Sequence, residues 1–366
     1  MPSANSPIRY DASVERPADD EGKAIADLKQ SFAHILETTA RDYGHAVRGV
    51  HAKGQGIIRG TFTVHEGLPA ELAQGLFAVG GTYEAVLRFS TAPGDVLEDA
   101  VSSPRGIGLK VLGAPGEKLA EVAQDGAQDF LMVNGPAFGA STPADFAASL
   151  KLLANTTDKA PGAKAALSAA MRVVEGAIEA LGGHSAMISM LGGAPEVHPL
   201  GETYYTQTPF RFGEHIAKFA LAPVSRGLTE RTGDTVAVHN RPDALREDIA
   251  EVIAEQGGTW DLRVQLCTDL EKMPIEDPTV VWDERHSPFV TVATLHVDPQ
   301  IAWTHGTSEA QEDRLSFNPW HGLVAHRPLG AINRARREVY DFSADYRADV
   351  NQCPVHAVRT LGDLDV

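Results

Sequence analysis

Short segments in the first third of the chain alternate between apolar and polar residues. The alternation covers residues 58–64, 85–90, 107–111 and 130–134. Because successive side chains of a strand point to opposite faces, each segment predicts a strand with one buried face. Turn-forming runs separate the segments, such as APGD and GAPG. This spacing predicts a meandering antiparallel sheet or barrel.

Other parts of the chain have helical or mixed patterns. Apolar residues recur every three or four positions from Ile25 to Leu36, which predicts a helix. Residues 143–192 are rich in Ala and Leu and predict at least two helices, broken at Pro161-Gly162. Further helices are predicted over residues 241–256 and 329–346, further strands over residues 204–221, 260–268 and 290–297, and a loop over residues 299–319.

The order of these elements predicts an α+β fold in one large domain. Residues 1–21 contain several prolines and acids and little to bury, so we expect a flexible N-terminal arm. No linker separates the two strand-rich blocks. We therefore interpret them as two halves of one barrel within a single domain, residues 22–366.

Charge and composition exclude several classes of protein. The 366 residues include 32 Lys and Arg against 49 Asp and Glu, a formal net charge of -17. Without a basic run, neither a nucleic-acid partner nor strong binding to an anionic membrane is expected. The two cysteines form no CxxC motif, which excludes cysteine-based zinc and iron–sulfur sites. No signal-peptide pattern and no apolar stretch of roughly 20 residues is present, so we expect a soluble, cytoplasmic protein.

Three segments of the predicted barrel carry candidate polar groups, although the common nucleotide, zincin and esterase motifs are absent. Arg48 and His51 precede the first strand. Arg88 and Ser90 share one face of the second, because side chains alternate. On an inner face they would meet an anion or polar ligand, and on an outer face only water, and the pattern leaves both open. Asn134 ends the fourth strand before Gly-Pro, where turn formers are also common.

The predicted C-terminal helix carries a fourth candidate group. Arg336, Tyr340, Ser343 and Arg347 are spaced by four, three and four residues and so share one face. An arginine one turn before a tyrosine favours the phenolate, and tyrosine is a known axial ligand of haem iron. Arg347 could pair with a carboxylate through two hydrogen bonds. Taken alone, the helix is better explained as an exposed arginine-rich surface with an aromatic residue packed inward.

Together and in order, the four segments resemble the haem-dependent catalase family, in particular its small members, the catalase-related peroxidases. The matching stretches are RGVHAKGQGIIRGTFTV, VLRFSTAPGD followed by SSPRGIGLKV, DFLMVNGPAF, and RREVYDFSADYR. The resemblance runs from about residue 45 to residue 347. It implies a catalase-like antiparallel eight-stranded β-barrel with surrounding helices. Haem, in its common form haem b, would lie between the barrel and the C-terminal proximal helix.

The resemblance also implies roles on the distal side of the haem. His51 would be the acid–base group and Asn134 its partner. Ser90 would hydrogen-bond the other nitrogen of His51 and fix its tautomer. Val50 would narrow the approach to the iron.

On the proximal side, the resemblance makes Tyr340 the axial ligand of the haem iron and Arg336 the group that keeps it ionised. Arg48, Arg88 and Arg347 would pair with the haem propionates. These roles would explain why arginines face inward in a barrel.

The chain departs from the family pattern in ways that affect the expected activity. It has Phe138-Gly139 where the family often has two adjacent aromatics, and Asp341-Phe342 where the family has Pro-Asp after the tyrosine. It also ends soon after the proximal helix, without the wrapping segments of larger catalases. We therefore expect a haem-dependent peroxidase that uses hydrogen peroxide or an organic hydroperoxide with an organic electron donor, with catalase as a side activity.

Other functions remain open at this point. A true catalase, or a haem synthase or oxygenase with a specific organic substrate, would use the same scaffold and ligands. A lipocalin-like barrel without haem would leave the coincidence of four ordered segments unexplained. The resemblance also implies a homo-oligomer, such as a dimer.

Overall fold

A computed structural model describes residues 6–119, 126–154, 196–353 and 358–365 of the chain. The strands are β1 (Gly54–Val64), β2 (Gly81–Thr91), β3 (Arg105–Val111), β4 (Gln128–Val133), β5 (Tyr204–Tyr205), β6 (Phe210–Phe212), β7 (His215–Pro223), β8 (Gly258–Leu266) and β9 (Val290–Val297). The α-helices are α1 (Glu21–Tyr43), α2 (Pro143–Ala154), α5 (Arg226–Thr229), α6 (Ala244–Gln256), α7 (Thr307–Arg314) and α8 (Ala331–Asn351).

Eight of the strands in the described residues close into an antiparallel barrel. Each strand pairs with the next in the order β1, β2, β3, β4, β5, β7, β8, β9, and β9 returns to β1. Closure leaves no long unpaired edge. The predicted α+β fold, with an eight-stranded antiparallel barrel and surrounding helices, is confirmed.

The barrel interior is the main hydrophobic core, and the alternating residues fill it. Ile58, Phe62, Leu87, Phe89 and Leu109 are all almost completely buried in this cluster. Burial of apolar surface contributes about 25 cal/mol per Å², so the inward positions hold the strands in register. The strands expected over residues 58–64, 85–90, 107–111, 130–134, 260–268 and 290–297 all form, within a few residues of their expected ends.

The expected single strand over residues 204–221 is wrong, because the segment folds as β5, β6 and β7. Gln207 has a positive φ of 62° and interrupts the extended backbone after β5. Gly213, with a φ of 59°, forms the turn of the hairpin between β6 and β7. The two-residue β5 is what closes the barrel, since Tyr205 pairs with both Val133 of β4 and Ala220 of β7.

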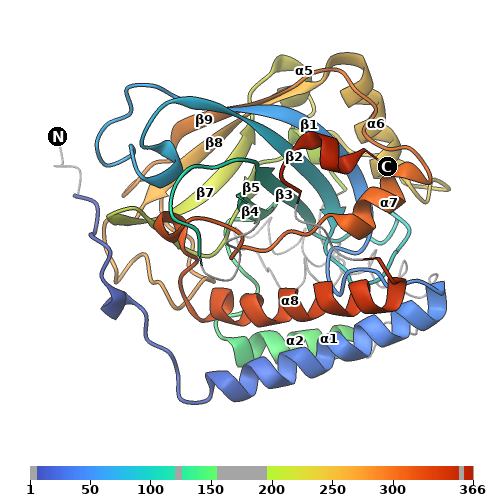
Figure 1. Ribbon diagram of the computed structural model, residues 1–366, viewed down its shortest axis with the longest axis horizontal. Helices are drawn as coiled ribbons and strands as arrows, with labels where there is room; N and C mark the ends of the chain where they lie inside the picture. Colours follow the sequence, from blue (N-terminus) through green and yellow to red (C-terminus); the bar gives the residue numbers. More distant parts are fainter. Residues whose placement is uncertain (1–5, 120–125, 155–195, 354–357, 366) are drawn as a thin grey trace.

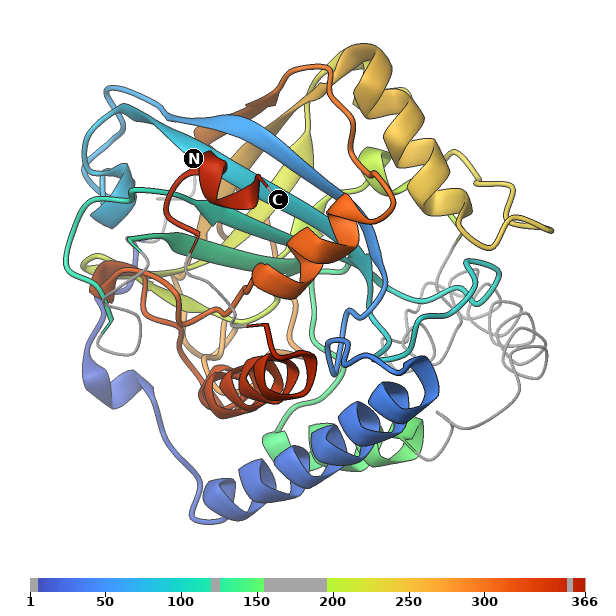
Figure 2. The ribbon, with the colours of Figure 1, turned by 45° about the vertical axis from the view of Figure 1, so that its right-hand side comes forward.

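Helices α1, α2 and α8 form a layer against one side of the barrel (Figure 1). Leu28 and Phe32 of α1 pack with Leu150 of α2 and with Ala335 and Val339 of α8 in a second hydrophobic cluster. Helix α8 lies between the barrel and α1, as both views show (Figures 1 and 2). The predicted helices at residues 25–36, 241–256 and 329–346 correspond to α1, α6 and α8. The predicted break at Pro161-Gly162 lies outside the described residues.

One expectation about irregular segments is corrected, the loop at residues 299–319, and the flexibility of the N-terminal arm stays a prediction. The described part of the expected flexible arm, residues 6–20, lies against the barrel: Ile8 N donates to Cys267 O at 2.8 Å, and Tyr10 N donates to Glu214 O at 2.7 Å. Ile8, Tyr10 and Val14 pack on a third cluster that includes Cys267. The expected loop at residues 299–319 contains α7. Polar residues dominate this helix, so it showed no apolar periodicity.

Candidate haem site

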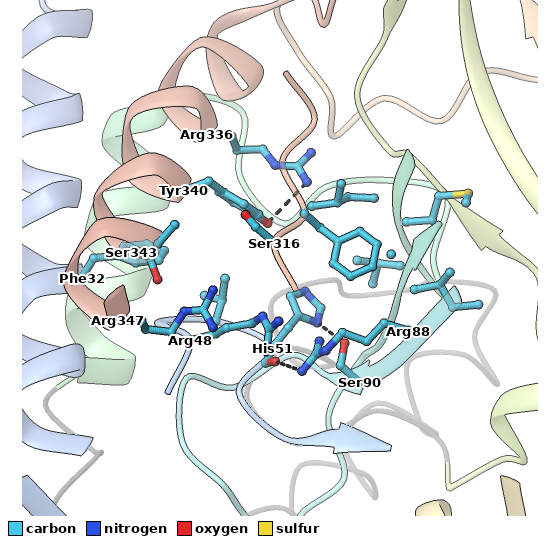
Figure 3. Close-up of a pocket in the computed structure, with 18 residues that line it drawn as sticks. Phe32, Arg48, His51, Arg88, Ser90, Ser316, Arg336, Tyr340, Ser343 and Arg347 are labelled. Carbon is cyan, nitrogen blue, oxygen red and sulfur yellow. Dashed lines mark hydrogen bonds between the residues drawn. The ribbon is translucent and has the colours of Figure 1, made fainter. Parts of the chain in front are cut away.

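A cavity lies between the barrel and helix α8, with an empty volume of about 680 Å³. The loop before β1, strand β2 and helix α8 all contribute to its walls (Figure 3). Eight of the nine residues expected at the site line it: Arg48, Val50, His51, Arg88, Ser90, Arg336, Tyr340 and Arg347.

The loop that carries His51 is held in an unusual backbone conformation. His51 has a φ of 54°, which is uncommon for a residue with a side chain and costs about 1–3 kcal/mol. Two backbone hydrogen bonds maintain it, from His51 N to Ala92 O at 2.9 Å and from Ala52 N to Pro93 O at 3.0 Å. Gly106 leaves room for the ring, since a Cβ there would lie 2.4 Å from His51 Cε1. The surrounding chain thus fixes the direction of the imidazole.

A hydrogen-bond chain defines which nitrogen of His51 is free. His51 Nδ1 lies 3.1 Å from Ser90 Oγ, and the Ser90 hydroxyl donates to Gly106 O at 3.3 Å. A hydroxyl has one hydrogen, so donation to the carbonyl leaves its oxygen to accept from Nδ1–H. In this arrangement Nε2 carries the lone pair of the neutral ring.

The environment of His51 keeps its ring neutral. Burial lowers the pKa of His51 to about 3, and the positive charges of Arg88, Arg336 and Arg48 act in the same direction. Both causes disfavour the imidazolium. At neutral pH the residue can accept a proton.

Tyr340 enters the cavity from α8, on the side opposite His51 (Figure 3). Arg336, one turn earlier, donates from Nη2 to the Tyr340 hydroxyl oxygen at 3.4 Å. The Arg336 guanidinium also lies 5.3 Å from the centre of the Tyr340 ring. The helical spacing of the sequence therefore produces the expected contact. Gly49 N donates to Ser343 Oγ at 3.3 Å and ties the histidine loop to the same helix face.

The three arginines expected near an anion lie together and share one acidic partner, Glu312 of α7. Arg88 Nε lies 2.8 Å from both carboxylate oxygens of Glu312, and Arg48 forms an ion pair with the same carboxylate. Arg347 donates from Nη1 to the backbone oxygen of Glu312 at 3.2 Å. Burial opposes ionisation of Glu312, but Arg48 and Arg88 more than offset it and hold its pKa below the usual value.

Asn134 does not line the cavity. Its Oδ1 accepts from Arg105 N at 2.8 Å, and its Nδ2 donates to Glu202 Oε1 at 2.8 Å. Burial raises the pKa of Glu202 to about 7. Asn134 thus caps the end of β4 and pairs with a buried carboxyl group, in the manner of a turn residue.

Sequence reasoning missed Glu312 and the apolar wall formed by Phe32 and Phe317. One signal for α7 was present: Glu309 stands three residues after Gly306 and accepts from its backbone N at 2.6 Å, as at many helix starts. Nothing in the sequence indicated that Glu312 would meet Arg48 and Arg88, which lie more than two hundred residues earlier.

The family profile described as Catalase matches residues 44–321 of the chain. The chain belongs to the catalase family. The match includes His51, Arg88 and Ser90 but ends before α8, so the structure adds Tyr340 and Arg347 to the cavity of this catalase-family chain. A comparison with curated proteins gives no match.

Two solved catalase structures have the same fold. A fungal catalase is 19% identical with a TM-score of 0.59, and the alignment covers 89% of this chain and 65% of that one. Catalase A from Saccharomyces cerevisiae is 17% identical with a TM-score of 0.56, and covers 88% of this chain and 66% of that one. The chain thus spans slightly less than two thirds of the length of these relatives.

Members of the catalase family bind haem, typically haem b, and the cavity fits this cofactor in three respects. Tyr340 presents a phenol oxygen to the cavity across from His51, and such an oxygen could hold the iron. The cluster around Glu312 has three guanidinium groups for one carboxylate, and Arg347 Nε is buried without a partner among the described residues. Phe32, Phe317 and Ile107 give an apolar wall.

Two further observations concern metal ions and membranes. The described residues contain no group of three or more His, Cys, Asp or Glu side chains that could hold a bare metal ion. None of the helices in that part of the chain combines the length and apolar character required to span a membrane.

Proposed function

We propose that the chain is a haem-dependent peroxidase that reduces hydrogen peroxide or organic hydroperoxides with electrons from an organic donor, with catalase as a side activity. The observation that carries this proposal is the placement of His51 and Tyr340 on opposite sides of one cavity, each held by its own partner. Haem supplies the redox chemistry of O–O cleavage when it is bound.

The role proposed for His51 is proton transfer at Nε2. Because the ring is neutral, Nε2 can accept the proton of a hydroperoxide and return it to the departing oxygen, as a general base and then a general acid. Ser90, through Nδ1, holds the ring and its tautomer during both transfers. The rigid loop backbone keeps Nε2 directed at the cavity.

On the other side, Tyr340 would ligate the iron as a phenolate. Arg336 would hold that oxygen in place through its hydrogen bond. Arg48, Arg88 and Arg347 would hold the propionates through charge-assisted hydrogen bonds.

The preference for a donor over a second peroxide rests on the segment after β4. Phe138 packs edge-on against Phe146 of α2, with ring centres 5.1 Å apart, and does not line the cavity. Asn134 is directed to Glu202. Among the described residues, this segment therefore contributes neither an aromatic ring nor an amide to the cavity, which leaves room beside His51 for an organic molecule.

The test is to load the protein with haemin and compare oxygen release from hydrogen peroxide with oxidation of a phenolic donor. We expect donor oxidation to be the faster reaction and to fall about 10²–10⁴-fold in His51→Gln, the usual loss for a proton-transfer group. Oxygen release that exceeds donor oxidation would identify a true catalase. Slow reaction with both would favour a synthase or oxygenase.

The ligand assignment needs its own comparison. Tyr340→Phe should change or abolish the Soret band of the loaded protein. Tyr346→Phe, on the same helix but outside the cavity lining, is the matched control and should leave the spectrum unchanged.

A homo-oligomer and a cytoplasmic location also remain predictions, which mass measurement in solution and cell fractionation can test.

A further inference from the structure

Glu312 is placed where an external anion would be expected to bind. Its side chain is only 12% exposed and lies between Arg48 and Arg88, which are 14% and 4% exposed. Its backbone oxygen accepts from Arg48 Nη2 at 3.0 Å as well as from Arg347. One residue of α7 thus engages all three arginines that the cavity offers to a carboxylate-bearing cofactor.

The neighbouring chain leaves space for this carboxylate. A Cβ at Gly54 would lie 2.1 Å from Glu312 Oε1, and Gly54 has no positive φ that would by itself require glycine. Helix α7 is held in position by the Glu309 contact at its start and by Gln311, which donates to Leu364 O at 2.9 Å. Glu312 therefore reaches the arginines from an anchored helix.

The charges of the cluster do not cancel. Three guanidinium groups surround Glu312, whose carboxylate contacts two of them, so the cluster keeps an excess of positive charge. Asp313, the next acid on α7, raises the pKa of Arg347, but its ion pair at 2.9 Å is with His45. Burial and the charge of Arg88 lower the pKa of both Arg48 and Arg347, as expected for cations short of partners. The two propionates of a haem would need the same guanidinium groups that Glu312 occupies.

We propose that Glu312 is the built-in counter-ion of the propionate site: it holds Arg48 and Arg88 in position before haem binds, and it limits haem affinity by using guanidinium hydrogen bonds that the propionates also need. The inference rests on haem as the cofactor in the proposed function. It makes Glu312 a positioning residue that stabilises the haem-free protein at the expense of cofactor affinity.

The test is Glu312→Gln, which keeps the size of the side chain and removes its charge. In the haem-free protein, three guanidinium groups would then repel one another, so the melting temperature should fall. In the same variant haemin should bind about tenfold more tightly, because the propionates no longer compete with a carboxylate for the arginines. Glu255→Gln removes one exposed acid from α6, away from the cavity, and is the control, with no change in haemin affinity.

A second ligand distinguishes an effect of the Glu312 charge on haemin affinity from an effect of cavity volume. Haemin dimethyl ester has no propionate charge, so Glu312→Gln should change its affinity by less than about twofold. An equal gain for haemin and its ester would overturn the proposal, because only the cavity volume would then matter. Unchanged or weaker haemin binding by Glu312→Gln would also overturn it.

Gly54→Ala gives an independent check if Glu312→Gln folds poorly. It keeps the acid but moves its carboxylate, and should change haemin affinity in the same direction by a smaller factor. Failure of this inference is distinct from failure of the proposed function. If the protein binds haemin, and both variants bind it with unchanged affinity, only the role of Glu312 is overturned. A wild-type protein that binds no haemin overturns the proposed function and this inference with it.

Discussion

The buried charges on the barrel and those at the cavity are arranged differently. On the barrel, Lys110 lies 2.7 and 2.9 Å from the two carboxylate oxygens of Asp129, and Lys53 lies 2.7 Å from Asp99. Each lysine is in direct contact with a buried acid, and Lys53 also lies 3.1 Å from Asp243. The arginine cluster at the cavity has one acid, Glu312, for three cations.

This difference separates structural charges from functional ones. A buried ion pair with both partners present needs nothing from outside, although the desolvation of its members limits what it adds to stability. A cluster with an excess of positive charge stays together only if the rest of the fold holds its arginines in place. Such a cluster also attracts an anion. Perturbed charges in a cavity are typical of functional sites for this reason.

The largest expected effect is the loss of stability when one member of a buried ion pair on the barrel is neutralised. Asp129→Asn leaves Lys110 buried without its counter-ion, so the free energy of unfolding should fall by about 3–5 kcal/mol. The folded fraction should still bind haemin with normal affinity. Chemical denaturation measures the free energy of unfolding, and haemin titration measures the affinity for haemin. A loss of affinity in folded protein would mean that Asp129 belongs to the site and would break the comparison.

An intermediate effect is expected from Arg347→Met, which removes one surplus cation. Charge-assisted hydrogen bonds contribute about 1.5–3 kcal/mol, so haemin affinity should fall about 10- to 100-fold. The haem-free protein should lose little stability, because the remaining arginines repel each other less. Haemin titration beside a thermal melt checks both. A large loss of stability with unchanged affinity would place Arg347 among the structural charges.

The smallest effect, counted per pH unit, concerns two neutral histidines, His51 at the cavity and His326, which is buried against Phe77. Burial lowers the pKa of each to about 3, below the value of about 6.5 in an unfolded chain. The unfolded state therefore binds more protons between these values, and stability falls as pH decreases from about 6.5 toward 3. Each histidine contributes a slope of up to about 1.4 kcal/mol per pH unit.

Unfolding measured from pH 7 to pH 4.5 checks this dependence. His51→Gln should remove about half of the slope that the two residues produce. An identical slope in the variant would show that His51 takes up a proton in the folded protein.

Much of the fold followed from local patterns, and the exceptions have local causes. Strand β9 and helix α8 were predicted because their apolar spacing matches the period of each element. The split of residues 204–221 into three strands depends on Gln207, and no sequence pattern indicates the positive φ of this residue. Helix α7 was missed because it buries almost no apolar surface.

The sequence predicted only part of the candidate site, because local spacing sets only some of its contacts. The contact between Arg336 and Tyr340 is set by helical spacing, and the shared face of Arg88 and Ser90 by strand alternation, so both could be expected. The turn of Asn134 toward Glu202 depends on a partner sixty-eight residues away. Only folding brings that partner close.

The sequence by itself determined most of the strands, several helices and the order of residues that place the chain among catalases. These features depend on the period of burial along each element, which the order of residues specifies directly. The tertiary structure decided which charges meet. Glu312 acquired its place because the fold brings it beside Arg88 of β2 and Arg48 of the histidine loop, and electrostatic pairing depends on distance in space, which sequence separation does not reveal.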